Sequence, residues 1–293
     1  MGKRIFLFLL TNLAVILVLS IIVSVFGLGR YVSPEGQLQL IPLALFCLVW
    51  GMGGAFISLL MSRWVAKRAM GVQLVNGQTG NAELDWLYNT VSQQAQVVGL
   101  PMPEVGVYDS PEVNAFATGP SKKRSLVAVS TGLLRTMQHN EAAAVIGHEL
   151  GHIKNGDMVT MTLLQGVINA FVMFLARIVA FVIRQRLDSR FANFIAFGIQ
   201  IALQIVLGVL GAMVVAAFSR YREFHADAAG AQLAGRGNMI SALQRLKATV
   251  EQVDNSAPAL AAYKISNRPA WLGLFSTHPP LETRIEALER MQV

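Results

Sequence analysis

A five-residue stretch near the middle of the chain reads His148-Glu149-Leu150-Gly151-His152. Residues four apart on a helix lie on one face, so both histidines can direct a ring nitrogen at one metal ion. Glu149 lies between them and is suited to take a proton from an attacking water. This spacing is the H-E-x-x-H signature of zinc-dependent proteases. The alternative is a helix that carries these residues by chance, but other parts of such a site occur elsewhere in the chain.

The flanking sequence predicts a helix around this motif. Asn140 is a suitable N-cap, and Glu141 places negative charge in the first turn. Residues 142–146 favour continuation of the helix, and Asn155-Gly156 supplies a C-terminal stop. We therefore expect both histidines to be held rigidly near the middle of a capped helix.

A third metal ligand must come from another part of the chain. The long form of the motif places a Gly and a His three and six residues after the second histidine, but Asn155 and Met158 stand there. A Glu from a later helix is the other common solution, and one segment offers it: Arg222-Glu223-Phe224-His225-Ala226-Asp227. We expect Glu223 to bind the metal and Asp227 to accept a hydrogen bond from a ligand histidine. A solvated charged helix face is the alternative, and His225 lies away from the face these two share.

The composition predicts a membrane protein. Hydrophobic residues make up 54% of the 293 residues, charged residues only 14%, and the mean hydropathy is +0.49. Residues 5–28 and 40–61 each reach the length of about 20 apolar residues that spans a bilayer. Lys3 and Arg4 precede the first run as in a signal peptide, but the run is long and no convincing cleavage site follows. We interpret the first run as a retained anchor.

A second hydrophobic pair lies between the zinc motif and Glu223. Residues 163–183 form a weaker span that contains Arg177, and residues 191–218 carry no charge. An even number of crossings returns Glu223 to the side of His148, as a shared metal requires.

Basic residues predict the orientation. They precede the first span and follow the second, at Lys3, Arg4, Arg63, Lys67 and Arg68. By the positive-inside rule both ends of this hairpin, and the zinc motif with them, face the cytoplasm. The basic link at residues 184–190 then lies outside, against the rule. A shallow or tilted hairpin, or a buried helix with Arg177 snorkelling, would account for it.

We expect four regions along the chain. They are an N-terminal transmembrane hairpin (1–62), a protease part with the zinc helix (63–160), a second hydrophobic hairpin (161–219) and a protease part with the third ligand (220–293). An apolar stripe predicts a helix ended by Gly99, formed by Leu84, Leu87, Val91, Ala95 and Val98. Further helices are expected over residues 239–250 and 281–291.

Two short β-rich runs, residues 105–108 and 126–130, flank a possible substrate segment. Asn114, Ala115 and Phe116 begin that segment. A strand beside a zinc helix can hold an extended peptide by adding it as one more strand, so we expect these residues to bind substrate. A purely structural hairpin is the alternative.

Together these motifs resemble the HtpX family of heat-shock membrane proteases, a relative of the CAAX prenyl proteases. The resemblance covers essentially the whole chain, and its motifs are Asn114–Gly119, His148–Asp157, Glu223–Asp227 and Thr277–Pro280 with Arg284. It implies a multi-pass α-helical membrane protein with a cytoplasmic α+β zinc metalloprotease domain of the gluzincin type. It also implies one zinc per subunit at His148, His152 and Glu223, with Glu149 as base. The implied function is a stress-response protease of the cell inner membrane that degrades misfolded or damaged membrane proteins and can cleave itself.

The expected reaction uses Glu149 to deprotonate water and then to pass the proton to the leaving amine. An oxyanion needs a second donor besides the metal, and His278 in Thr277-His278-Pro279-Pro280 is our candidate. The alternative role of His278 is structural, orienting the helix that begins beyond Pro279.

Other classes are less favoured. Cys47 is the only cysteine and lies inside a span, so neither a disulfide framework nor a thiol nucleophile is expected. The net charge of +7 fits attraction to anionic lipid headgroups better than nucleic-acid binding. Polypeptide substrates and the bilayer are the expected partners, without an indication of oligomeric state. The alternatives are a processing protease for lipidated peptides and a non-hydrolytic zinc-binding membrane protein.

Overall fold

The apolar segments of the chain form long helices. A computed structural model describes residues 2–187, 190–255 and 274–291. The chain divides into two compact units, Met1–Leu60 with Thr160–Val215 and Met61–Val159 with Ala216–Val293. Residues 188–189 of the basic link and parts of the last predicted region lie outside the described residues.

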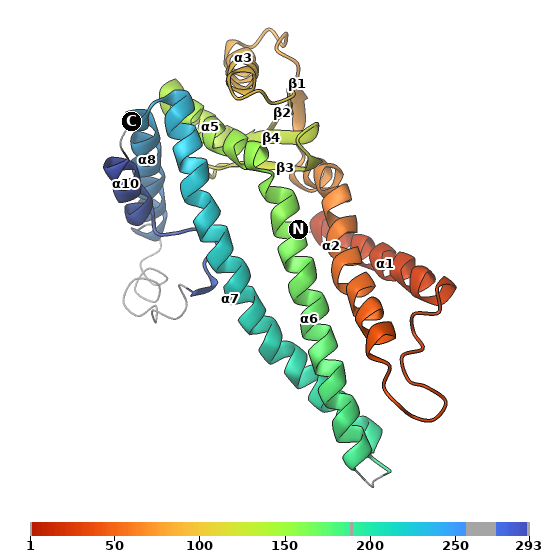
Figure 1. Cartoon of the computed structure of the whole chain (residues 1–293). Coiled ribbons are helices and arrows are strands. Elements are labelled where there is room, and N and C mark those ends of the chain that lie inside the picture. The colour runs from red at the N-terminus through yellow and green to blue at the C-terminus, as the bar shows by residue number, and fades with distance from the viewer. Residues whose placement is uncertain (1, 188–189, 256–273, 292–293) are drawn as a thin grey trace. The chain divides into compact units, whose positions relative to one another are not determined.

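The first unit is helical. It contains α1 (Gly2–Val25) and parts of α2 (Leu40–Met70), α6 (Asp157–Arg186) and α7 (Ala192–Ala234). Among the described residues, α2, α6 and α7 are each long and apolar enough to cross a membrane, and Leu13–Val25 is a shorter apolar stretch. Figure 1 shows α1 and α2 joined by the loop of residues 26–39. The four predicted spans thus correspond to four helices with shifted ends.

Glycines allow close helix packing in this unit. A Cβ at Gly51 of α2 would lie 2.4 Å from the backbone nitrogen of Ala170 in α6. The two backbones therefore approach each other at a distance that only a residue without a side chain permits. Gly211 of α7 makes room for a side chain instead, since the Cγ2 of Ile168 in α6 would lie 2.5 Å from an added Cβ.

The second unit contains a four-stranded sheet. Its strands are β1 (Gln73–Val75), β2 (Glu104–Tyr108), β3 (Ala115–Ser121) and β4 (Arg124–Ser130), in the order β1-β2-β4-β3. β2 and β4 are parallel, and the outer pairs are antiparallel. The two β-rich runs were predicted correctly, but β1 was not predicted. β3 contains most of the candidate substrate segment and is an edge strand.

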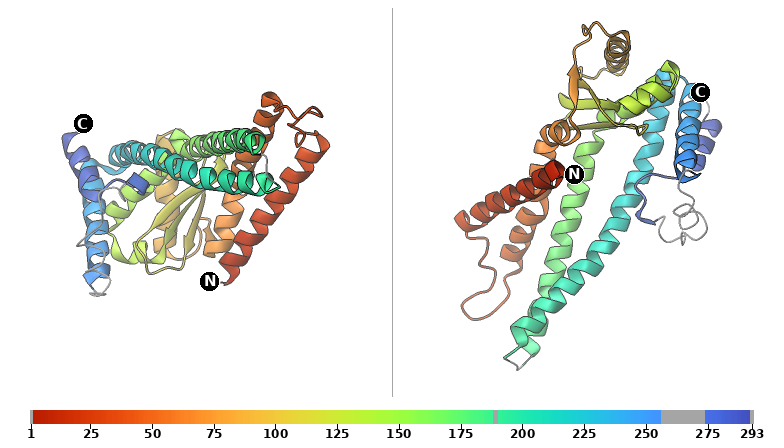
Figure 2. Two further views of the ribbon diagram at one scale, coloured as in Figure 1. Left: turned by 90° about the horizontal axis from the view of Figure 1, so that it is seen from below. Right: turned by 180° about the vertical axis from the view of Figure 1, so that it is seen from behind.

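Successive side chains of a strand point to opposite faces of the sheet, and apolar side chains occupy both faces here. Val127 and Val129 of β4 join a core with α3 (Ala82–Val97) and α5 (His139–Asn155), whereas Leu126 and Ala128 contact the end of α2 and Phe116. Figure 2 shows the strands as one layer with α5 running beside them. The helix α3 buries Leu87, Val91 and Ala95 of the predicted stripe, together with Gln94.

The zinc-motif helix begins earlier than predicted. Its N-cap is Gln138, whose backbone N–H donates to Glu141 at 3.0 Å, so the prediction of Asn140 as N-cap was wrong. Asn140 instead donates from Nδ2 to Oδ1 of Asn238 at 2.8 Å. The predicted stop was confirmed, since α5 ends at Gly156 with a φ of 73°.

Three further helices complete the described part of the second unit: α4 (Thr131–Thr136), α8 (Arg236–Asn255) and α10 (Leu281–Arg290). The predicted helices over 239–250 and 281–291 correspond to α8 and α10. The third-ligand segment lies in α7, a continuous helix of 43 residues that begins in the apolar run.

Candidate metal centre

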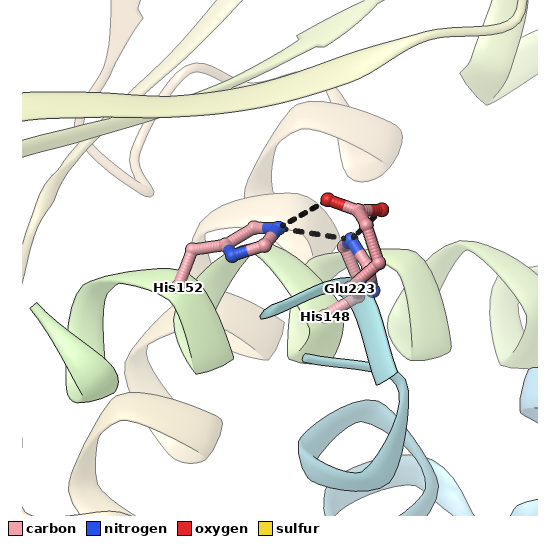
Figure 3. Close-up of side chains that lie close together, drawn as sticks. All are labelled: His148, His152 and Glu223. Atoms are coloured by element: carbon pink, nitrogen blue, oxygen red, sulfur yellow. Dashed lines mark hydrogen bonds and ion pairs between the residues drawn. The ribbon is translucent and has the colours of Figure 1, made fainter. Parts of the chain in front are cut away.

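The helices α5 and α7 bring the three predicted ligands together. One ligand atom from each of His148, His152 and Glu223 lies within 4.8 Å of the other two. The two Nε2 atoms are 3.1 Å apart, and the Glu223 carboxylate is 3.7 Å from His148 Nε2 and 3.4 Å from His152 Nε2. Figure 3 shows both imidazoles on α5 facing the Glu223 carboxylate. The i,i+4 spacing therefore directs both histidines to one position, as predicted from the sequence.

Each imidazole has a carboxylate on its other nitrogen. Nδ1 of His148 donates to Asp227 at 2.9 Å, and Nδ1 of His152 donates to Asp157 at 2.7 Å. A donor hydrogen on Nδ1 leaves Nε2 as the lone-pair nitrogen, aimed at the centre. Asp157 was missed in the sequence, although an acidic residue directly after the Gly156 stop, opening the next helix, is a usable signal.

Arg284 of α10 holds the Asp227 carboxylate. Its Nε donates to Oδ2 at 2.8 Å and its Nη2 to Oδ1 at 2.5 Å, a two-pronged pairing within a buried site. Nη1 also lies 3.4 Å from Glu223. Burial raises the pKa of Asp227, but hydrogen bonds from Arg284 and His148 outweigh it and hold that pKa below its usual value. The carboxylate therefore stays charged and keeps the His148 ring oriented.

The donor set fits a zinc ion. Two imidazole nitrogens and one carboxylate are a common ligand set for catalytic zinc, which leaves a fourth position open. The Glu223 carboxylate is buried, and its Oε2 atom lies 3.7 Å from His148 Nε2, so the carboxylate and the two imidazoles face one enclosed position. Burial lowers the pKa of His152, but Asp157 and Glu223 raise it to about 9. The surroundings thus stabilise positive charge at the point where the ligands converge.

Glu149 follows His148 on α5 and is also buried, with 9% of its surface exposed. Its charge is one of the lesser causes of the raised pKa values of His152 and Arg284. It is not one of the three clustered ligands. The remaining histidines of the second unit also lie outside the cluster. His225 is exposed and contacts the Tyr221 carbonyl, and His139 stacks on Trp86.

His278 lies beside the centre on the segment that precedes α10. Its Nδ1 is 2.8 Å from Glu223 Oε2, and 65% of its side chain is exposed. Arg220 of α7 fixes this segment by donating to the carbonyls of Leu274 and Ser276, at 3.1 and 2.8 Å. An exposed imidazole next to a ligand carboxylate can contact both the ligand and a bound substrate.

The candidate substrate segment lies at the free edge of the sheet. Asn114 exchanges two hydrogen bonds with Ser130, its N–H donating to Oγ at 3.1 Å and its carbonyl accepting from the Ser130 N–H at 2.9 Å. β3 then pairs with β4 on one side, and no strand of the described chain pairs with its other side. The same strand contacts α5, the helix of the zinc motif.

Comparison with known proteins adds three findings. A model of peptidase family M48 matches residues 81–292. The chain is 50% identical to "Protease HtpX homolog" of Methylacidiphilum infernorum, over 99% of both chains, and 50% identical to "Protease HtpX" of Cellvibrio japonicus, over 97% of both. The crystal structure of S. mikatae Ste24p has the same fold, with a TM-score of 0.64 at 18% identity, over 98% of this chain and 66% of that one.

Proposed function

Because the chain belongs to peptidase family M48, whose HtpX proteases it resembles along its length, we propose that it degrades misfolded or damaged membrane proteins from the cytoplasmic side of the inner membrane. The coarser statement is established: the chain is a multi-pass membrane zinc metalloendopeptidase, and its substrates are polypeptides. This excludes the alternative of a non-hydrolytic zinc-binding protein. The proposal depends on one observation: residues of the zinc site lie on the same helices that are apolar enough to cross a membrane.

Both halves of the metal centre continue into candidate membrane spans. Asp157, which orients His152, is the first residue of α6, and Glu223 lies in α7. Both helices are long and apolar enough to cross a bilayer. A protease with one ligand on such a helix, and with the partner of a second ligand at the start of another, is suited to polypeptides that the same bilayer presents. We infer cytoplasmic orientation from the basic residues around the first hairpin.

Glu149 is our proposed general base. When bound, zinc polarises the scissile carbonyl and lowers the pKa of water to about 7. The Glu149 carboxylate accepts the proton of the attacking water and afterwards delivers it to the leaving amine. Its place on α5, directly after the ligand His148, supports this role.

Asp227 and Arg284 are proposed to position the ligands. The Arg284 guanidinium fixes the Asp227 carboxylate, which fixes the Nδ1 hydrogen of His148. We propose that the substrate backbone adds to the free edge of β3 near Asn114, Ala115 and Phe116. That addition would place an extended peptide along the strand that contacts the zinc helix.

The test is the Glu149→Gln variant of the full chain, purified in detergent. An amide of nearly the same shape cannot act as a base, so we expect proteolysis of an unfolded membrane-protein substrate to be abolished. About one zinc per chain should remain, measured by metal analysis. Glu289→Gln, an exposed change on α10, is the matched control and should retain full activity. Turnover by Glu149→Gln at the wild-type rate would refute the proposed base.

Self-cleavage is tested with the same pair. Zinc added to metal-free wild-type protein should produce fragments of the chain, and the Glu149→Gln variant should remain intact. Fragments that also form in the variant would point to a contaminating protease. Processing of lipidated peptides has no separate support among the described residues, so membrane proteins remain our proposed substrate class.

A further inference from the structure

A cavity of about 650 Å³ lies within the first unit, and none of the metal-centre or substrate residues assigned above lines it. The loop of residues 29–39 forms one wall, and residues of α6 and α7 form the others. Three arginines line it: Arg30 from the loop, with Arg177 and Arg184 from α6. None of its described lining residues is acidic. Three guanidinium groups around one space without a carboxylate favour an anionic occupant.

The spacing on α6 directs two of these arginines to the same side. Arg177 and Arg184 are seven residues apart, close to two full turns, so their side chains leave α6 in nearly the same direction. The residues between them that line the cavity, Ala180 and Phe181, share that face. Arg177 stacks over Phe46 at 4.9 Å and Arg184 over Phe181 at 5.4 Å. The aromatic rings hold the guanidinium planes without using their N–H donors.

The Arg177 guanidinium has an unused hydrogen-bond donor. Its Nη1 atom is buried and makes no hydrogen bond with any described residue. A buried guanidinium nitrogen without an acceptor is costly, and its presence in an apolar helix calls for a partner. Asn193 and Gln200 of α7 also line the cavity and add amide donors. These guanidinium and amide N–H groups can donate hydrogen bonds to the oxygens of a phosphate group.

An adjoining space indicates where the rest of such a ligand lies. A second cavity, of about 360 Å³, shares Gly29 and Arg30 with the first. Its other walls are mainly apolar and aromatic, including Val23, Phe46 and Trp50. A phosphate site that continues into an apolar groove fits an amphipathic molecule with an acyl chain.

We propose that this cavity binds the phosphate headgroup of an anionic phospholipid, with Arg30, Arg177 and Arg184 as its cationic contacts and an acyl chain along the adjoining groove. Such a lipid also supplies counter-charge for the basic link that follows α6, which the positive-inside rule disfavours on its expected side. The site is separate from the metal centre, so it stands independently of the proposed substrates.

The test measures lipid binding to the delipidated, zinc-loaded full chain by native mass spectrometry. The two probes are dioleoyl-phosphatidylglycerol and dioleoyl-phosphatidylcholine, which share acyl chains and differ in net charge. We expect phosphatidylglycerol to bind at least roughly tenfold more tightly, since the choline cation of phosphatidylcholine is repelled by the three arginines and offsets the charge of its phosphate. Equal binding of the two lipids would overturn the proposal.

Single variants then locate the site. Arg30→Gln and Arg184→Gln should each weaken phosphatidylglycerol binding by roughly tenfold and weaken phosphatidylcholine binding by less, so that the preference for phosphatidylglycerol falls. Arg186→Gln is the matched control, because Arg186 is also exposed at the end of α6 but does not line the cavity. A loss in Arg186→Gln as large as in Arg184→Gln would indicate general surface charge and would contradict the assigned site.

Two further arms complete the design. Inorganic phosphate at millimolar concentration should fail to displace the lipid, and displacement would identify a soluble phosphate as the occupant instead. Arg177 packs on Phe46, so Arg177→Gln can disturb the helices themselves. The test therefore uses variants of the exposed Arg30 and Arg184. Circular dichroism and a zinc content of one per chain check that these variants are folded.

Discussion

Each ligand histidine at the metal centre has a carboxylate of its own. Asp227 orients His148 across a long sequence separation, whereas Asp157 orients His152 from five residues away. The first pair depends on tertiary folding and on Arg284, and the second is local to the end of α5. Loss of either carboxylate is expected to weaken metal binding, since such partners fix ring orientation and the protonated nitrogen.

His278 is the residue whose role the geometry sharpens most. If it donates to the oxyanion, His278→Ala should lower kcat by about 10²-fold with little change in zinc affinity. Its position 2.8 Å from Glu223 Oε2 allows a different outcome. Weaker zinc binding with an unchanged kcat of the zinc-loaded enzyme would show that it supports the ligand instead. His225→Ala, an exposed histidine outside the cluster, is the control and should change neither quantity.

Glu141 gives a pH-dependent prediction at the opposite end of α5. Its buried carboxylate accepts from Ser241 at 2.6 Å, from the Gln138 backbone at 3.0 Å and from Arg245 at 3.4 Å. Burial raises the pKa of Glu141, but these hydrogen bonds outweigh it and place the pKa below its ordinary value of 4.5. A lowered folded-state pKa means that the carboxylate stabilises the fold above the ordinary value and loses this effect as the pH falls below it.

Glu141→Gln should therefore lower the free energy of unfolding by about 2 kcal/mol at pH 7, the value of charge-assisted hydrogen bonds. The difference in Tm from wild type should be constant above pH ~5 and shrink below the ordinary pKa. Thermal melts across this pH range measure it. Glu286→Gln, at an exposed pair with Arg290, should change stability by less than about 0.5 kcal/mol at any of these values. A Tm difference for Glu141→Gln that persists at low pH would contradict the charged role.

At the scale of elements, local sequence signals predicted most of the helices. Apolar length predicted the hydrophobic segments, periodicity predicted α3, and Asn155-Gly156 marked the end of α5. The N-cap of α5 was misplaced because Gln138 and Asn140 are both able to cap, and a contact with Asn238 of α8 occupies the latter. The local sequence around Asn140 does not reveal that its partner is Asn238, which lies 98 positions away.

The sheet was predicted less completely for the same reason. β1 has only three residues and becomes a strand by pairing with β2, so no periodic pattern marks it. β3 contains Gly119, with a φ of 144°, and a register shift near its end. Such irregularity hides a strand in the sequence and becomes clear only beside β4. Likewise, the continuation of α7 from an apolar run into a charged segment appears only in the folded helix.

The contact between α2 and α6 predicts the effect of a small change. Gly51→Ala would place a Cβ 2.4 Å from the Ala170 backbone nitrogen, so the helices must separate. We expect a loss of about 1–3 kcal/mol in stability, typical of overpacking. Gly198→Ala on α7 is the matched control, because nothing lies within 4 Å of its added Cβ and Ala favours the helix by up to about 1 kcal/mol. Melting of both variants in detergent, followed by circular dichroism, makes the comparison, and equal Tm values would disprove the close contact.

At the scale of the whole molecule, the shared metal centre constrains topology. His148 and Glu223 meet in the second unit although α6 and the apolar part of α7 lie between them in sequence. If the intervening hydrophobic stretch enters the membrane, it is expected to leave and return on the same side, as composition and spacing also predict. The assignment of sequence pieces to units depends on tertiary contacts that no local pattern encodes.

Cysteine accessibility tests this topology in a background in which the buried Cys47 is replaced. Single cysteines at the exposed positions Lys154 and Arg236 should label from the same, cytoplasmic side with a membrane-impermeant reagent. In parallel, Glu223→Ala should lose most of its bound zinc. Labelling of the two positions from opposite sides would be incompatible with Glu223 as the third ligand.

Distance along the chain also separates the parts of the metal centre in time while a ribosome makes them. His148 is synthesised 79 positions before Asp227 and 136 positions before Arg284. At about 5–20 residues per second, the last of these follows the first by roughly 7–27 s. During that interval α6 and α7 are synthesised. Glu223 is added first, Asp227 next and Arg284 last. The metal centre therefore cannot be complete until Arg284 has been made.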